Sequence, residues 1–382
     1  MPPQTAAAPV TTHGATDDFM PLHGIDHVEL HVGNAAQAAY FYEHAFGFRR
    51  VAFAGLETGR RQTTSHVLAQ GRIRLVLTGT LVAGTDVARH HARHGDGVRT
   101  IALSVPDVDH AYREAVARGA RGVQPPLTET DEHGSVRRAS IATYGDTLHA
   151  FVDRSAYRGA FLPGYAPVAA AGTSGGAAPE DLLLTIDHVV GNVELGRMQE
   201  WVSFYEDVFG MTEMVHFSDE AISTEYSALM SKVVTSGDGR VKFPINEPAE
   251  GKRRSQIDEY LEFYDGPGAQ HLALATRDIV GTVAALRARG VGFLPIPDVY
   301  YDDVAARVPA VAGRLEELRE QGILVDHDDE GYLLQIFTKP VGDRPTVFFE
   351  IIERHGARGF GEGNFKALFE AIEREQDRRG NL

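Results

Sequence analysis

The chain has 382 residues, more than one typical domain core, which favours two domains or an internal duplication. Its formal net charge of −16 disfavours nucleic acid or an anionic membrane as a partner. The lack of cysteine excludes disulfides, thiolate nucleophiles and cysteine-ligated metals, whereas 17 histidines allow a site built from His and carboxylate. With no apolar run of spanning length and no secretory signal at the N-terminus, we expect a cytoplasmic protein that does not bind membranes.

The first half begins with a tail and then alternates strands with helices. Residues 1–18 are small and polar, a composition that predicts disorder. The pattern from Gly24 to Phe48 predicts a β-branched strand followed by an amphipathic helix. Val98 to Pro126 predicts a strand, an Asp-initiated turn, a helix and another strand, and Asp146 to Arg154 predicts a further strand.

All three blocks return in the second half, so the chain contains an internal repeat. The matched blocks are Gly24–Phe48 with Thr185–Met211, Val98–Pro126 with Ala269–Pro297, and Asp146–Arg154 with Arg344–Arg354. The second half also carries insertions, chiefly at Asp298–Ile323. We predict an α+β protein in which each half forms a mixed sheet curled into a half-barrel, with its helices outside.

The repeat also sets the expected domain boundaries. A stretch of small residues, Gly and Pro at 163–181 predicts a linker. It separates an N-terminal domain at 19–162 from a C-terminal domain at 182–382.

Comparison of the two halves singles out three residues of the second. It carries His, His and Glu where the first carries His, Thr and Ala; the pairs are His188 and His27, His271 and Thr100, and Glu350 and Ala150. Two nitrogens and one carboxylate form the facial triad of non-haem Fe(II) sites, which leaves coordination positions open. A metal would also explain why Glu350 stands in an apolar strand, because a cation neutralises a buried carboxylate. We therefore expect a metal in the C-terminal half and a metal-free N-terminal half.

Each of these residues also has a simpler explanation. A strand histidine is more often a hydrogen-bonded core or surface residue than a ligand, and Glu350 alone fits an edge strand or an ion pair. His27 has the same Ile-Asp-His-Val context as His188 without the partners, and alternation turns His149 away from the Ala150 face. Only the three residues taken together favour a metal site.

The histidine-rich stretch Arg89–Gly97 is a weaker metal candidate. Its charged neighbours and its Gly-rich end predict a solvated helix end or turn rather than a ligand set.

Several stretches of the second half resemble the 4-hydroxyphenylpyruvate dioxygenase family. They include TIDHVVGNVELGRMQEWVSFYEDVFGM, KFPINEPAEGKRRSQIDEYLEFYDGPGAQHLAL and DDEGYLLQIFTKPVGDRPTVFFEIIERHG. The resemblance covers Phe19 to Leu382 and implies the vicinal oxygen chelate fold, with βαβββ modules forming an open barrel in each half. The implied reaction turns 4-hydroxyphenylpyruvate and O₂ into homogentisate and CO₂ during tyrosine and phenylalanine breakdown.

The resemblance also implies the composition of the site. It implies one Fe(II) per subunit on His188, His271 and Glu350, and a homo-oligomer. Its catalytic positions fall on Ser227, Asn246, Gln256, Gln270 and Gln335, and its substrate-binding positions on Phe337, Phe348, Phe360, Asn364 and Phe365. Taken singly, the amides are as well explained as surface residues or caps, and the phenylalanines as core packing.

The C-terminal segment has two interpretations. Phe365, Leu368, Phe369 and Ile372 lie on one face of an expected helix. The helix is either an ordinary terminal helix or, as the resemblance suggests, a lid over the metal.

Other functions stay open at this point. 4-Hydroxymandelate synthase would use the same substrate and triad but hydroxylate the benzylic carbon. An extradiol ring-cleaving dioxygenase would consume a catechol without releasing CO₂. A non-catalytic binding protein would be expected to have a broken triad.

Overall fold

The computed structural model describes residues 18–168, 181–217, 228–249, 254–360 and 362–380. Most of the predicted disordered tail and of the predicted linker at 163–181 therefore lies outside the described residues. The described start of that linker includes a short strand, β9 (Ala166–Pro167), which pairs with β2 at the edge of the first sheet.

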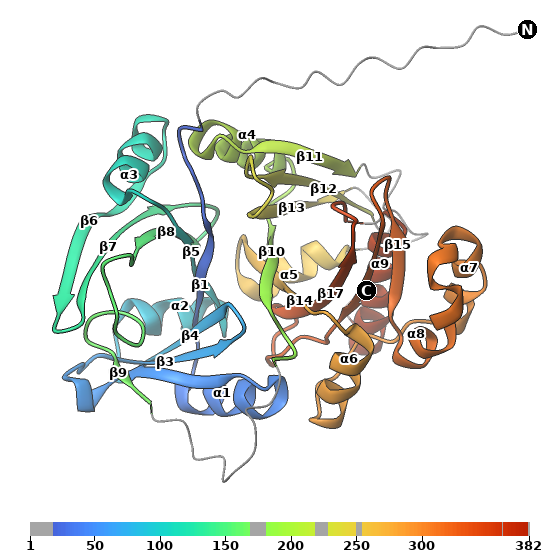
Figure 1. Ribbon diagram of the computed structural model, residues 1–382, viewed down its shortest axis with the longest axis horizontal. Helices are drawn as coiled ribbons and strands as arrows, with labels where there is room; N and C mark the ends of the chain where they lie inside the picture. The colour runs from blue at the N-terminus through green and yellow to red at the C-terminus, as the bar shows by residue number, and fades with distance from the viewer. Residues whose placement is uncertain (1–17, 169–180, 218–227, 250–253, 361, 381–382) are drawn as a thin grey trace, which may run out of the picture.

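The first half contains two modules, as the repeat predicts, and each has the βαβββ order that the resemblance implies. The first module consists of β1 (Gly24–His31), α1 (Ala35–Phe41) with a π-helical turn η1 (Tyr42–Phe46), β2 (Arg49–Ala54), β3 (Thr63–Gln70) and β4 (Ile73–Thr80). After α2 (Asp86–His94), the second consists of β5 (Gly97–Ser104), α3 (Val108–Ala117), β6 (Gly122–Asp131), β7 (Gly134–Ala142) and β8 (Leu148–Asp153). The order β6-β7-β8-β5-β1-β4-β3-β2-β9 joins both modules in one curled sheet (Figure 1).

The second half repeats this plan. Its first module is β10 (Thr185–Asn192), α4 (Met198–Phe209), β11 (Thr212–Phe217), β12 (Ala228–Thr235) and β13 (Lys242–Ala249), followed by α5 (Gln256–Tyr264). Its second is β14 (Gly268–Ala275), α6 (Ile279–Ala288), β15 (Leu324–His327), β16 (Tyr332–Phe337) and β17 (Phe348–His355), and α9 (Glu362–Arg379) follows. The sheet order is β11-β12-β13-β10-β14-β17-β16-β15, so the duplicated half-barrel fold is confirmed.

The predicted insertion lies between α6 and β15. It forms η3 (Asp298–Tyr301), α7 (Val304–Arg307), η4 (Pro309–Arg314) and α8 (Leu315–Gln321). In Figure 1 these elements stand on the outer side of the second half-barrel, next to β15.

Strand registers show that the residues matched in the sequence occupy equivalent positions. His27 pairs with Ala102 across β1 and β5, and Ala102 pairs with Ala150 across β5 and β8. In the second half, His188 pairs with Ala273 across β10 and β14, and Ala273 pairs with Glu350 across β14 and β17. Thr100 pairs with Glu29 across β1 and β5, and His271 pairs with Val190 across the equivalent strands β10 and β14, so Thr100 and His271 occupy equivalent positions.

Local chemistry explains where the helices begin. Asp107 and Asp278 are the N-caps of α3 and α6, and each side chain accepts a hydrogen bond from a backbone N–H three residues later. The predicted Asp-initiated turns are therefore the starts of the two equivalent helices.

The two halves pack against each other behind the strand that carries Glu350. The ring of Phe46 in η1 lies with its centroid 5.1 Å from that of Phe349, and Tyr42 lies 5.7 Å from the same ring. Because Phe349 faces this core, its neighbour Glu350 faces the interior of the second half-barrel.

The prediction of a solvated turn at Arg89–Gly97 was wrong in part. The stretch lies mainly on α2, but His90 and His94 are buried because α2 packs against α5 of the other half. His94 bonds the carbonyl of Tyr264 and stacks on its ring at 4.3 Å. Among the described residues, this stretch supplies no group of three converging metal ligands.

None of the described helices is long and apolar enough to cross a membrane.

Candidate metal centre

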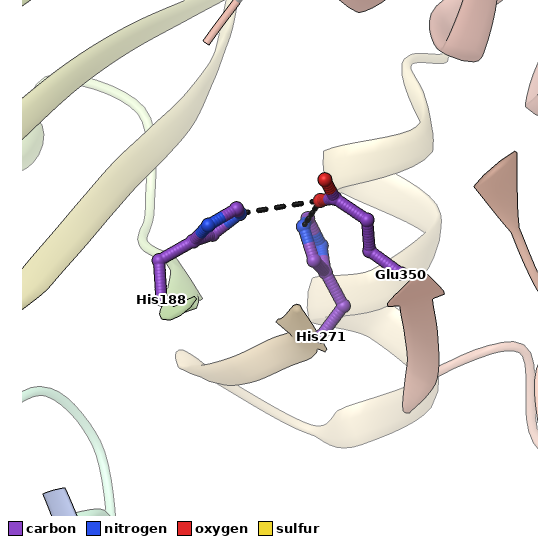
Figure 2. Close-up of side chains that lie close together, drawn as sticks. All are labelled: His188, His271 and Glu350. Atoms are coloured by element: carbon purple, nitrogen blue, oxygen red, sulfur yellow. Dashed lines mark ion pairs between the residues drawn. The ribbon is translucent and has the colours of Figure 1, made fainter. Parts of the chain in front are cut away.

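Three side chains from three adjacent strands meet inside the second half-barrel. His188 comes from β10, His271 from β14 and Glu350 from β17, and one ligand atom from each lies within 4.8 Å of the others. Oε2 of Glu350 lies 3.2 Å from Nε2 of His188 and 3.5 Å from Nε2 of His271 (Figure 2). Among the described residues this is the one group of His and carboxylate ligands with such geometry.

Burial makes the charges of these groups interdependent. Burial alone disfavours the Glu350 carboxylate, but the attraction of His188 and hydrogen bonds from both histidines outweigh it and lower its pKa to about 2. Burial disfavours a charged His188, yet Glu350 and Asp187 raise its pKa above the usual value. For His271 burial is the largest influence and lowers the pKa, which favours the neutral imidazole that binds a metal.

Each of the three side chains is oriented by a neighbour. Nδ1 of His188 lies 2.8 Å from a carboxylate oxygen of Asp187, and Nδ1 of His271 lies 3.0 Å from Oε1 of Gln270. With Nδ1–H donated to these oxygens, the Nε2 atoms that contact Glu350 here would present their lone pairs to a bound cation in place of a proton. The chemistry and geometry of the three groups therefore fit a divalent metal with nitrogen and oxygen ligands.

Glu350 is held by Gln335, whose Nε2 donates to Oε1 over 2.7 Å. Asn364 in turn donates from Nδ2 to Oε1 of Gln335 over 2.8 Å. Because β17 lies between β14 and β16, the edge-strand explanation for Glu350 is excluded.

An arginine fixes the residue beside His188. Arg354 donates two hydrogen bonds of 2.8 Å to Asp187 and a third of 2.6 Å to the carbonyl of Gly359. The adjoining ring of Phe360 meets the His188 ring edge-on at 4.8 Å.

The first half contains the same arrangement without the metal candidate. Arg154 bonds both carboxylate oxygens of Asp26 and the carbonyl of Phe161, and Phe161 meets the ring of His27 at 5.1 Å. The same His-Asp-Arg-Phe contacts therefore occur in both half-barrels. The second half-barrel differs in having a histidine and a carboxylate at the positions of Thr100 and Ala150.

The cavity over the three ligands is almost filled. It leaves about 10 Å³, close to the volume that one water molecule needs, and is lined by Val190, Pro244, Gln335, Phe337, Phe360 and Leu368 besides the ligands. Phe348 lies behind it, stacked on His271 at 4.7 Å. An aromatic substrate is larger than this volume, so side chains that line the cavity must move to admit it.

The predicted amides Gln256 and Gln270 lie together at a neighbouring cavity. That cavity is lined also by Phe348 of the metal site and by Ile372, Glu375 and Arg379 of α9. Oε1 of Gln256 is buried and has no hydrogen-bond partner in the described structure.

The predicted residue Asn246 belongs to a buried polar cluster that the sequence did not reveal. Its Nδ2 donates to Oδ1 of Asn192 over 3.3 Å, and Ser231 faces it across β12 and β13. Asn246 Oδ1, Asn192 Nδ2 and Ser231 Oγ are buried without partners among the described residues. The predicted Ser227 lies outside the described residues, and Ser231 is the serine that the register sets beside Asn246.

The predicted C-terminal helix is present, and part of its predicted apolar face lies among the described residues. Residues 362–379 form α9, with Asn364, Leu368 and Phe369 buried, whereas the side chain of Phe365 lies outside the described part of the chain. Phe369 packs with Leu229, Val233, Ile257 and Phe360.

Comparisons with known proteins agree with this architecture. Residues 24–155 and 185–336 each match the Glyoxalase/Bleomycin resistance protein/Dioxygenase superfamily. A 4-hydroxyphenylpyruvate dioxygenase of Dictyostelium discoideum is 50% identical over 94% of this chain and 100% of its own length. The enzyme of the same name from Yarrowia lipolytica is 46% identical over 99% and 98%. A solved structure of a 4-hydroxymandelate synthase mutant from Streptomyces coelicolor shares 37% identity, with a TM-score of 0.83 over 94% of this chain and all of that one.

Proposed function

Because this chain belongs to the 4-hydroxyphenylpyruvate dioxygenase family, within the Glyoxalase/Bleomycin resistance protein/Dioxygenase superfamily, we propose that its C-terminal half converts 4-hydroxyphenylpyruvate and O₂ into homogentisate and CO₂. The observation that carries the proposal is the convergence of His188, His271 and Glu350 on one point inside the second half-barrel.

We assign Fe(II), one per chain, to these three residues. When bound, Fe(II) would supply a chelation site for the carboxylate and keto oxygens of a 2-oxo acid and a place for O₂, which three protein ligands leave open. The small, mostly apolar cavity supports this assignment, because a site that activates O₂ must keep water away from the reacting atoms.

The remaining side chains bind and orient the substrate. Phe337, beside His271, and Phe360, beside His188, supply apolar walls that suit an aromatic ring. The buried polar cluster of Asn192, Ser231 and Asn246 offers uncharged donors and acceptors suited to a phenol group. The cavity that holds Gln256 and Gln270 extends the site toward α9.

The C-terminal helix acts as the lid of this site. Leu368 lines the small cavity, and Phe360 precedes the helix, so displacement of α9 would open the cavity to substrate. The ion pair of Arg379 with Glu259, 2.6 Å long, holds the far end of the helix closed.

The experiment that tests the function is aerobic incubation of the Fe(II)-loaded protein with 4-hydroxyphenylpyruvate, followed by chromatography of the products and measurement of CO₂. Homogentisate with one CO₂ per O₂ is expected. 4-Hydroxymandelate would assign the chain the alternative activity of its structural neighbour, and no product would refute both.

Two further assignments belong to the proposal. We propose a homo-oligomer in the cytoplasm, as the family resemblance implies, with sedimentation velocity and cell fractionation as the respective tests.

A further inference from the structure

A line of four polar side chains runs from the metal candidate to the inserted segment. Gln335 donates to Glu350, Asn364 donates to Gln335, and the hydroxyl of Tyr300 lies 2.8 Å from Oδ1 of Asn364. Tyr300 belongs to η3, and its hydroxyl also accepts from the backbone N–H of Val325 over 2.8 Å.

We propose that Tyr300 positions the metal-binding carboxylate of Glu350. It acts through the side-chain amides of Asn364 and Gln335. This inference rests on the proposed function only in taking Glu350 as a metal ligand.

The direction of every hydrogen bond in the line follows from the carboxylate. An ionised carboxylate only accepts, so Gln335 must present its NH₂ group to Glu350 and its oxygen to the next residue. That oxygen needs a donor, which is the NH₂ group of Asn364. The oxygen of Asn364 then needs a donor of its own, and the hydroxyl of Tyr300 supplies it.

The carbonyl of Val325 competes for the same proton. It lies 2.9 Å from the Tyr300 hydroxyl, which has only one hydrogen to donate. The amide of Asn364 has no such choice, because its NH₂ group is committed to Gln335 and a buried acceptor without a partner is costly. The Tyr300 hydroxyl therefore donates its hydrogen to Oδ1 of Asn364. Without this hydroxyl, the side-chain amides of Asn364 and Gln335 would both be free to turn over.

This line of hydrogen bonds fixes the rotation of the Glu350 carboxylate. Oε2 of Glu350 faces both histidines, at 3.2 and 3.5 Å, whereas Oε1 is the atom that Gln335 holds. If the Gln335 amide turned over, two oxygens would face each other, and the carboxylate would rotate away from the position it shares with His188 and His271.

The first half has Ala150 at the place of Glu350, and Gln335 and Tyr300 have no equivalents there either. By strand register, the first-half counterpart of Gln335 is Arg138. Its side chain forms an ion pair with Glu129. The segment that carries Tyr300 is an insertion of the second half. Among the described residues, the complete line therefore occurs only beside His188, His271 and Glu350.

The same residues hold the start of the lid. The backbone N–H of Asn364 donates to Oδ2 of Asp326 over 2.9 Å, which ties the first turn of α9 to β15. Movement of α9 would therefore break the line at Asn364 and loosen Glu350.

Tyr300→Phe tests the proposal, with Tyr301→Phe as the matched control. Both variants keep the ring and lose one hydroxyl from η3, but among the described residues the Tyr301 hydroxyl bonds only the carbonyl of Ile323, 3.0 Å away. We measure Fe(II) affinity by anaerobic titration, the visible spectrum of the Co(II)-loaded protein, and the ratio of O₂ consumed to product formed.

Tyr300→Phe should weaken Fe(II) binding about tenfold, the lower end of the effect of outer-shell residues, shift the Co(II) bands and raise O₂ consumed per product. Tyr301→Phe should match the parent protein in all three. Equal affinities and spectra in the two variants would overturn the proposal. The affinity and the spectrum are read without substrate, so they decide the question even if the parent protein makes no homogentisate.

Discussion

Nε2 of His188 lies 3.2 Å from Oε2 of Glu350, although a whole strand, β14, separates the strands that carry them. The contact is possible because the sheet is curled, so that side chains on its inner face converge. His271, on the intervening strand, completes the group, with its Nε2 3.5 Å from Oε2 of Glu350. The curvature of the sheet, rather than any local sequence motif, brings the three ligands together.

The repeated His-Asp-Arg unit offers a comparison within one molecule. Asp187→Asn should weaken Fe(II) binding about 10- to 100-fold, because Asp187 fixes the ring orientation and tautomer of His188. Asp26→Asn removes the equivalent carboxylate beside His27 and should lower thermal stability without changing Fe(II) affinity. Equal effects of the two substitutions on anaerobic Fe(II) titration would show that Asp187 has only a structural role.

The first-half unit should also make folding pH-dependent. Burial disfavours the Asp26 carboxylate, but His27 and Arg154 outweigh it and hold the pKa of Asp26 well below its usual range. Since the folded pKa lies below the unfolded one, this stabilisation is complete above about pH 4 and is lost as the pH falls toward the folded value. Asp26→Asn should lower the free energy of unfolding by on the order of 2 kcal/mol at pH 7 and by progressively less below pH 4. Urea unfolding across that range measures it, and a constant difference between the two proteins would contradict the linkage.

The proposed lid, α9, carries the aromatic side chain of Phe369, which is fully buried against β12 and α5. Phe369→Ala should cost roughly 3 to 5 kcal/mol of packing, enough to undock α9 without unfolding the sheet. Limited proteolysis should then cut within 362–379, and product formation should fall. Arg374→Ala, an exposed position on the same helix, is the control. Protease resistance equal to that of the control would mean that α9 is held by other contacts.

The buried hydroxyl of Ser231 should matter for substrate rather than for metal. Ser231→Ala should lower kcat/KM by about tenfold or more, the loss of roughly one hydrogen bond to bound substrate, with Fe(II) affinity unchanged. Ser236→Ala, whose hydroxyl bonds Asp238 in a turn of the same hairpin, is the matched control. If both variants keep the parent kcat/KM, Ser231 does not contact substrate.

Much of this site could be predicted because the chain repeats itself. The first half acts as a built-in comparison: where it has Thr100 and Ala150, the second half has a histidine and a carboxylate, and the strand registers are the same. The apolar strand around Glu350 already indicated a buried charge in need of a partner.

The rest depends on contacts that no local pattern encodes. His90 and His94 have the polar neighbours of a solvated helix, and only the packing of α5 from the other half buries them. Ser231 is singled out by strand register, since sequence alone does not tell which serine faces Asn246. Tyr300 lies in an insertion with no counterpart in the first half, so the repeat gave no comparison for it.

The central claim is that Glu350 and the two histidines hold the iron, and anaerobic Fe(II) titration of Glu350→Gln tests it most directly. Glu29→Gln is the control, because Glu29 is a partly buried carboxylate on the equivalent strand of the first half, where Thr78 donates to it over 2.7 Å. The parent protein and Glu29→Gln should each bind one Fe(II) per chain, and Glu350→Gln should bind it at least about 100-fold more weakly. Unchanged binding in Glu350→Gln would contradict the account.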